Sequence, residues 1–334
     1  MKKNLNYNSC GREEVSPKAY TFAEATGPVP YTLTNDYLFR AVFQSNEKAL
    51  RGLLCALLHL KPEDIKSLII QNPIEIGDTI EAKDFMFDIK LVLNDNTIVN
   101  IELQVANGRN WPERSLSYLC RSFDNLEKGQ VYKTVKTAIH IGILDFDVFS
   151  DAPEFYATFK MLNVKTHKIY SDKFVLSVLN LNRADLATEE DRNYSLDCWA
   201  RLFKAKDWEE IKMLAKKSSA IVEAANAMYD FTADSVIREH CLMREEFQRR
   251  QRERVLWEKE LEEKIAQSED ILAKTEDKLT QAEDKLTQTE DKLTQTEDKL
   301  TQTEDKLTQA EDKLTQANEE IERLRAEIAE LKCR

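Results

Sequence analysis

Apolar and polar residues alternate along residues 85–105, FMFDIKLVLNDNTIVNIELQV, and this period of two predicts two β-strands joined by a turn. The turn falls at residues 94–96, because Asn and Asp accept the backbone conformations that a hairpin turn requires. A turn centred on Asp95 pairs residues across the two strands: Asp88 with Glu102, Lys90 with Asn100 and Val92 with Ile98. A slip of one residue would move every side chain to the other face.

The two faces of this hairpin differ in polarity. One face is entirely apolar and is expected to pack in the core: Phe87, Ile89, Leu91, Leu93, Val99, Ile101, Leu103 and Val105. The other face is polar: Asp88, Lys90, Asn100, Glu102 and Gln104. Carboxylates that face each other across a strand pair, about 5 Å apart at Cβ, repel, and a divalent cation between them turns that repulsion into attraction. The alternative is an ordinary solvated polar face, which many antiparallel hairpins have.

The apolar pattern around the hairpin predicts further helices and strands. Thr34 or Asn35 is a suitable N-cap for a first helix. The other predicted elements are a helix over 48–60, a strand within 67–74, a helix from 110–112 to before Gly129, and strands over 134–144, 155–163 and 174–181. This order of elements predicts an α/β fold, with a mixed sheet flanked by helices.

The helix after the hairpin has two faces of different character. Its apolar positions at helical spacing are expected to face the core: Leu116, Leu119, Cys120 and Phe123. Arg114 and Tyr118 fall on another face.

The pattern becomes helical from residue 184 to about residue 255, and beyond Trp257 it repeats every seven residues. Residues 275–316 are six copies of TEDKLTQ, with Ala in place of the first Thr in two of them. This period places Leu at heptad position a, Ala or Thr at d, Glu at e and Lys at g, which favours a parallel coiled coil. The alternative is a lone charged helix, because Thr is a poor helix former.

Composition limits the function classes. The 334 residues are 42% hydrophobic, enough for one sizeable core. The net charge of −12 argues against indiscriminate coating of nucleic acid, so any DNA contact must be local. The six cysteines and four histidines are scattered without metal-ligand spacing, so free thiols and structural or surface histidines are expected. No signal-like or membrane-spanning apolar run occurs, so a soluble cytoplasmic protein is expected.

Three segments, in this order, resemble the PD-(D/E)XK nuclease superfamily, in particular its branch of recombination-promoting nucleases and transposases. They are TNDYLFRAVF (34–43), the hairpin, and RSLSYLCRSF (114–123) followed by KGQVYKTVKTAIHIGILDF (128–146). That branch has Glu-x-Gln where the wider superfamily has Glu-x-Lys, and here it reads IELQ, Ile101–Gln104. The resemblance implies a restriction-endonuclease-like sheet. The expected division is an arm (1–31), a nuclease-like domain (32–183), a helical accessory region (184–256) and a coiled coil (257–334).

The resemblance also implies roles for single residues. Asp88 and Glu102 would bind Mg²⁺, with Mn²⁺ as a substitute, and Asp36 would complete the metal site unless it only complements the helix dipole. Gln104 would be the third catalytic residue, although a neutral amide orients water and does not act as its base. Lys90 would supply positive charge, or is simply solvated. Arg114 and Tyr118 would contact DNA, with a surface ion pair to Glu113 or Asp124 as the alternative for Arg114.

The function implied by the resemblance is a Mg²⁺-dependent DNA endonuclease, a hydrolase associated with recombination or transposon mobility. The coiled coil would make it a parallel homodimer or higher homo-oligomer, with two active sites for two strands. The alternative is a catalytically inactive nuclease-like scaffold that binds DNA or organises an assembly through its coiled coil.

Overall fold

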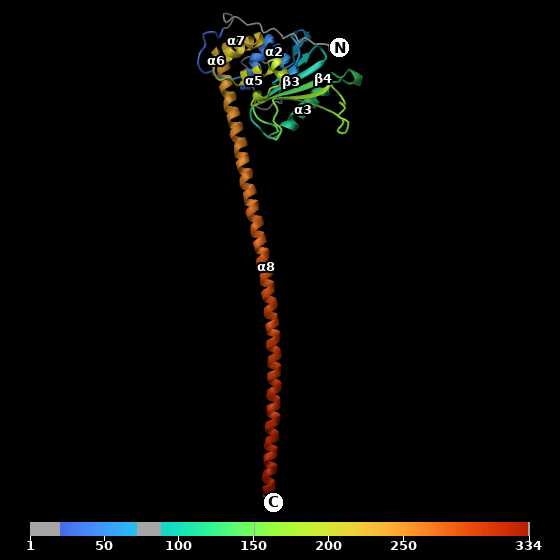
Figure 1. Ribbon diagram of the computed structural model, residues 1–334, viewed down its shortest axis with the longest axis vertical. Helices are drawn as coiled ribbons and strands as arrows, with labels where there is room; N and C mark the ends of the chain where they lie inside the picture. The colour runs from blue at the N-terminus through green and yellow to red at the C-terminus, as the bar shows by residue number, and fades with distance from the viewer. Residues whose placement is uncertain (1–20, 72–87, 150, 333–334) are drawn as a thin grey trace, which may run out of the picture. The chain divides into compact units, whose positions relative to one another are not determined.

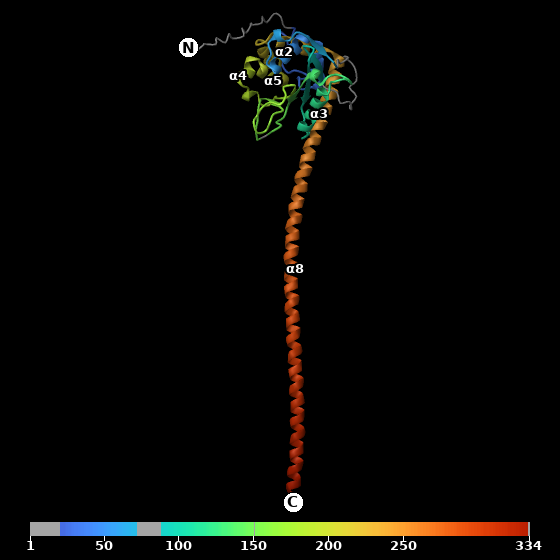
Figure 2. The same cartoon turned by 90° about the vertical axis from the view of Figure 1, so that its right-hand side faces the viewer.

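The computed structural model describes residues 21–71, 88–149 and 151–332. The chain divides into two compact units, residues 1–257 and residues 258–334, and each is described by itself. The first unit contains the sheet and its helices (Figures 1 and 2). The second consists, where it is described, of one helix.

The sheet of the first unit has six strands in the order β1-β2-β3-β4-β6-β5. They are β1 (Leu68–Ile70), β2 (Ile89–Leu93), β3 (Thr97–Gln104), β4 (Thr137–Leu144), β5 (Tyr156–Lys160) and β6 (Phe174–Asn180). The pairs β3–β4 and β4–β6 are parallel, and the other neighbouring pairs are antiparallel. The prediction of a mixed α/β sheet flanked by helices is therefore confirmed.

The β2–β3 hairpin has the predicted register, with Lys90 beside Asn100 and Val92 beside Ile98. Asn94 and Asp95 have φ angles of +49° and +60°, the left-handed conformation that these two residue types tolerate. The apolar face of the hairpin packs in the core, as expected, with Leu91, Val99 and Ile101 fully buried. The predicted strand residues 85–87 lie outside the described residues.

Seven helices of the first unit are α1 (Asp36–Ser45), α2 (Glu47–Leu58), α3 (Trp111–Phe123), α4 (Glu189–Asn193), α5 (Leu196–Lys204), α6 (Trp208–Ala215) and α7 (Ser219–Ala233). Asn35 caps α1, as predicted, because its side chain accepts a hydrogen bond from the N–H of Leu38. The helix α8 (Ser235–Lys332) begins in the first unit.

One hydrophobic core joins the apolar sheet face to helices from both ends of the first unit. Phe39 and Phe43 of α1 pack their rings against Phe203 of α5, and Phe43 also packs against Trp199. The helix α7 contacts α1, α2 and α6. The region expected as accessory, residues 184–256, therefore contributes to the same core as the sheet.

The helix α3 packs on the opposite, polar sheet face and contacts β3, β4 and β6. The apolar stripe predicted on this helix was wrong in part: Leu119 is buried, as expected, but Leu116 and Cys120 are exposed. The other buried side chains of this helix are Trp111, Ser115, Tyr118 and Ser122. The reason is the polarity of the sheet face beneath the helix, where Asn100 is buried and its Nδ2 donates to Ser122 Oγ.

Several predicted boundaries shift. The helix α3 ends at Phe123 and not near Gly129, and β4 begins at Thr137 because residues 132–134 form a 3₁₀ turn. The strand β5 ends at Lys160.

In the second unit, α8 presents a row of exposed leucines. The six leucines of the TEDKLTQ copies, from Leu279 to Leu314, are 59–62% exposed in the single chain. Threonines of the repeat donate to carbonyls one turn earlier, for example Thr294 to Glu290 and Thr296 to Lys292. The coiled coil itself stays a prediction. No helix among the described residues has the length and apolarity needed to cross a membrane.

Candidate active site

Two carboxylates meet at the open end of the β2–β3 hairpin. Ile89 pairs with Ile101, so Asp88, one residue earlier, comes opposite Glu102. The Oδ2 atom of Asp88 accepts a hydrogen bond of 2.6 Å from the N–H of Leu103, which holds its carboxyl group against β3. The hairpin therefore brings the two predicted acids to one place on the polar face.

Asp88 lies in a crowded electrostatic environment. Burial first, and then the charges of Asp36 and Glu102, raise the pKa of Asp88 to about 8, while the Leu103 N–H and Arg40 oppose this shift. Three carboxyl groups are thus electrostatic neighbours: Asp36 of α1, Asp88 directly before β2, and Glu102 of β3. A group with this pKa is mostly protonated at neutral pH.

Glu102 is buried, with only 4% of its surface exposed. Its Oε1 accepts a hydrogen bond of 2.6 Å from Nε of Arg114 in α3, and Nη2 of the same guanidinium group forms an ion pair with it at 2.6 Å. Its Oε2 is buried and has no hydrogen-bond partner among the described residues. Burial raises the pKa of Glu102, and Arg114 counteracts that shift.

Asp36 stands at the first position of α1, and α8 supplies its counter-charge. Arg244 Nε lies 2.9 Å from Oδ1 and 3.0 Å from Oδ2 of Asp36, and Nη2 binds Oδ2 as well. The predicted third metal ligand is therefore bound to a guanidinium group in this structure. Arg40 of the same helix is also buried, and its Nε has no hydrogen-bond partner among the described residues.

The other predicted residues surround these acids. Gln104, two residues after Glu102, is half-buried, and its amide donates a long hydrogen bond of 3.5 Å to the carbonyl of Ala106. Lys90 is half-buried and pairs with Asn100.

Arg114 and Tyr118 have different surroundings from those expected. Tyr118 is 4% exposed and stacks on His140, with ring centroids 5.8 Å apart and planes within 9°. The guanidinium carbon of Arg114 lies 5.1 Å from the centre of the Tyr118 ring. Arg114 pairs with Glu102 rather than with Glu113 or Asp124, and the expected DNA contact of these two residues stays a prediction.

His140, in the middle of β4, is the site residue that sequence reasoning missed. It is fully buried, its Nε2 lies 3.7 Å from Glu102 Oε2, and neither ring nitrogen has a hydrogen-bond partner among the described residues. Burial, followed by the charge of Arg114, lowers the pKa of His140 to about 3, so the ring is neutral. The available signal was a histidine inside the buried strand TAIHIGIL, on the strand that follows the motif.

Gly142 explains how α3 approaches Glu102 so closely. Gly142 is the β4 residue beside Glu102 in the parallel register. A Cβ atom at Gly142 would lie 2.1 Å from Trp111 Cζ2, so the ring of Trp111 occupies the space of the missing side chain. The start of α3, with Arg114 one turn further on, is seated directly over Glu102.

The donor set fits a hard divalent cation in part. Carboxylate oxygens are the ligands that Mg²⁺ prefers, and Oε2 of Glu102, which is buried without a hydrogen-bond partner among the described residues, is the kind of oxygen that such an ion would use. Among residues 21–71, 88–149 and 151–332, no three His, Cys, Asp or Glu side chains converge closely enough to hold a metal ion. Asp88 and Glu102 therefore fit as a pair, whereas Asp36 would first have to leave Arg244.

Residues 33–258 match the family model of PD-(D/E)XK nuclease family transposases. The match extends through the helices of residues 184–256. No curated protein sequence and no solved structure matches the chain significantly.

Proposed function

Because the chain belongs to the PD-(D/E)XK nuclease transposase family, we propose that it is a DNA endonuclease that hydrolyses phosphodiester bonds with the help of Mg²⁺. The observation that carries this proposal is the facing pair of Asp88 and Glu102, with one glutamate oxygen that is buried and has no hydrogen-bond partner in the described part of the chain. A structural carboxylate in such a position would ordinarily be satisfied within the protein. Mn²⁺ would serve as a substitute for Mg²⁺.

Asp88 and Glu102 would hold the metal through their carboxylate oxygens. A bound Mg²⁺ supplies Lewis acidity and lowers the pKa of water. Because Asp88 is mostly protonated without the metal, it would release its proton when the metal binds. The N–H of Leu103 would keep Asp88 in place during this change.

Arg114 would have two tasks at this site. Without metal, it neutralises Glu102 through one hydrogen bond from Nε and an ion-pair contact from Nη2, each at 2.6 Å. With metal and DNA bound, its guanidinium group would turn to a phosphate, since the same planar arrangement of donors fits both carboxylate and phosphate. Gln104 would orient the attacking water by hydrogen bonding, because a neutral amide is not a useful proton acceptor.

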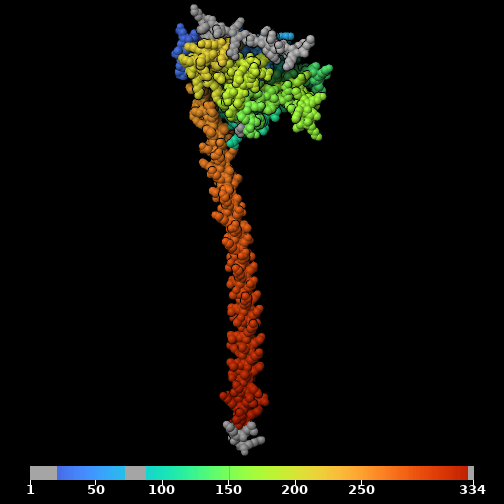
Figure 3. Space-filling model, viewed as in Figure 1, coloured from blue at the N-terminus to red at the C-terminus, as the bar shows by residue number. Residues whose placement is uncertain are grey.

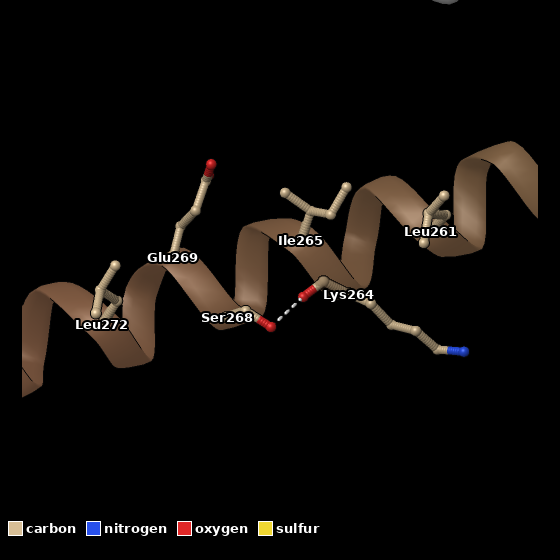
Figure 4. Close-up of a pocket in the computed structure, with 6 residues that line it drawn as sticks. All are labelled: Leu261, Lys264, Ile265, Ser268, Glu269 and Leu272. Atoms are coloured by element: carbon tan, nitrogen blue, oxygen red, sulfur yellow. Dashed lines mark hydrogen bonds between the residues drawn. The ribbon is translucent and has the colours of Figure 1, made fainter.

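The row of exposed leucines on α8 suits a second copy of the chain. Leu261, Ile265 and Leu272 lie on neighbouring turns of the helix and are 41–58% exposed (Figure 4). An apolar heptad row with Glu at e and Lys at g favours a parallel pair of helices. The active protein would then be a parallel homodimer with two active sites.

A plasmid-nicking assay tests the proposal. Wild-type protein with Mg²⁺ is expected to nick supercoiled DNA, and EDTA is expected to abolish nicking. Asp88→Asn should lower the rate at least a hundredfold. The matched control is Asp95→Asn in the turn at the other end of the same hairpin, where Asp95 accepts from Ser67 Oγ; it should keep wild-type activity.

Two results would contradict the proposal. One is the absence of nicking by wild type with either Mg²⁺ or Mn²⁺, together with no rise in melting temperature on adding either ion. The other is equal nicking by wild type and Asp88→Asn. The first result would favour the catalytically inactive scaffold.

A further inference from the structure

A hairpin connects the end of β5 with the start of β6. An isolated antiparallel bridge between Leu162 and Ile169 joins its two arms. The Asn163 side chain accepts from the N–H groups of Lys165 and Thr166, at 2.9 and 3.0 Å, and closes the turn. Residues 161–173 therefore form a hairpin held by its own hydrogen bonds, which lies within the yellow-green part of the first unit (Figure 3).

This projection is positively charged in an acidic chain. Residues 160–173 contain four lysines and one aspartate, and the neighbouring residues 128–136 contain three lysines and no acid, whereas the whole chain has a net charge of −12. Lys173 joins the two segments, because its Nζ donates to the carbonyls of Val135, at 2.8 Å, and Lys133, at 3.3 Å. None of the seven lysines takes part in an ion pair among the described residues: Lys128, Lys133, Lys136, Lys160, Lys165, Lys168 and Lys173.

Large apolar side chains are exposed among these lysines. Tyr132 is 88% exposed, Val164 87% and Tyr170 82%. Exposed apolar groups gathered in one place usually mark an interaction surface. Lysines contact phosphates, and exposed aromatic rings contact bases, so this mixture is typical of surfaces that bind nucleic acid.

We propose that residues 128–136 and 160–173, here called the lysine hairpin surface, bind the phosphate backbone of DNA outside the active site. This inference rests on the proposed function, and it names where the substrate is held. Phe174, the residue directly after this surface, pairs with Ala138 of β4, and Ala138 pairs with Ile98 of β3. Glu102 lies four residues further along β3, which is about 13 Å in the strand direction, or about four nucleotide steps of one DNA strand.

Charge favours DNA over other partners for this surface. The rest of the chain repels a polyanion, so contact with DNA must be concentrated where lysines outnumber acids. The lysine hairpin surface has this excess. An anionic membrane is the competing partner, and the experiment below distinguishes it.

The test measures binding of a fluorescein-labelled 30-base-pair duplex by anisotropy, in EDTA so that no cleavage occurs. Lys165→Glu/Lys168→Glu should weaken binding at least tenfold. It should also lower the slope of log Kd against log salt by about two, since each lost phosphate contact contributes about 0.9. The matched control is Lys216→Glu/Lys217→Glu, an exposed pair after α6 with the same change in charge; it should stay within twofold of wild type.

Three other outcomes would contradict the proposed role of the lysine hairpin surface. Equal binding by the hairpin variant and the control would overturn the lysine hairpin surface, and if wild type still nicks plasmid, the proposed function stands. Wild type that neither binds the duplex nor nicks plasmid would remove both. Binding of phosphatidylserine vesicles that depends on Lys165 and Lys168, with unchanged DNA binding, would assign the surface to a membrane and overturn the proposal.

Discussion

Arg244 binds both carboxylate oxygens of Asp36, which lies 208 residues earlier in the chain. This ion pair connects the first turn of α1 with α8, and the two side chains are only 15% and 22% exposed. Because Asp36 also raises the pKa of Asp88, the pair belongs to the electrostatics of the candidate active site.

Removal of Arg244 should destabilise the first unit. Arg244→Met is expected to lower the free energy of unfolding by about 2 kcal/mol, because it leaves a partly buried carboxylate without its donors. The double variant Asp36→Asn/Arg244→Met should lose less than the sum of the two single variants. Urea unfolding followed by circular dichroism measures both effects.

Arg250→Met is the control on the same helix. Arg250 pairs with Glu246 at the surface, with side chains 70% and 49% exposed, so its removal should cost less than about 0.5 kcal/mol. Strict additivity of the Asp36 and Arg244 substitutions would show that this ion pair contributes nothing to stability.

The raised pKa of Asp88 predicts a dependence of stability on pH in the metal-free protein. The folded chain holds a proton on Asp88 up to about pH 8, whereas the unfolded chain loses it near its ordinary pKa of about 3.9. The contribution of Asp88 to the free energy of unfolding is therefore complete below about pH 4 and is lost as the pH rises towards 8. The free energy of unfolding should fall with pH by at most about 1.4 kcal/mol per pH unit.

Asp88→Asn should remove this slope, because an amide does not titrate. Unfolding measured in EDTA between pH 5 and 8 should give a flatter curve for the variant than for wild type. Parallel curves would mean that the Asp88 carboxyl group is already ionised in the folded protein.

The lowered pKa of His140 predicts that stability falls as the pH is lowered, the opposite of the dependence predicted from Asp88. The unfolded chain protonates this ring near pH 6.5, but the folded protein keeps it neutral down to about pH 3. The contribution of His140 is therefore complete above about pH 6.5 and is lost as the pH falls towards 3. His140→Asn, measured by unfolding between pH 4 and 6.5, should flatten this part of the curve.

His167→Asn is the control for this histidine prediction. His167 lies in an exposed turn, so its replacement should leave the acid slope unchanged. If the free energy of unfolding depends on pH equally in wild type and His140→Asn, the buried ring is not the cause of the loss of stability in acid.

The exposed leucines of α8 predict self-association. Leu293→Glu/Leu300→Glu changes two a positions and should convert a dimer into a monomer in analytical sedimentation. Thr294→Glu/Thr301→Glu changes the neighbouring outward positions and should leave the dimer intact.

Disulfide formation tests the orientation of the two helices. In a Cys333→Ser background, Ser268→Cys at a d position should form a disulfide with the same position of the second copy only if the helices are parallel. A monomeric wild type would contradict the prediction.

The parts of the fold that sequence reasoning predicted depend on local signals. The hairpin register follows from a period of two and from an Asn-Asp-Asn turn, and the start of α1 follows from one capping residue, Asn35. The polar face of the hairpin also indicated where Asp88 and Glu102 meet.

The missed features depend on contacts between distant segments. No local pattern relates Arg244 to Asp36 or His140 to Glu102. The polar face was expected to meet solvent or a metal, but α3 covers it, which buries Asn100 and turns Tyr118 inward. The apolar stripe on α3 misled because the choice of buried face depends on the polar sheet surface beneath it, which helical periodicity does not report.

The indole ring of Trp111 that fills the space above Gly142 determines how closely α3 can approach the sheet. The helix can lie this close to the sheet because Gly142 has no side chain: even the methyl group of an alanine would collide with Trp111. Any larger residue at this position would push α3 away from the sheet and move Arg114 out of reach of Glu102. A backbone position without chemistry of its own thus controls whether the arginine and the acid can meet.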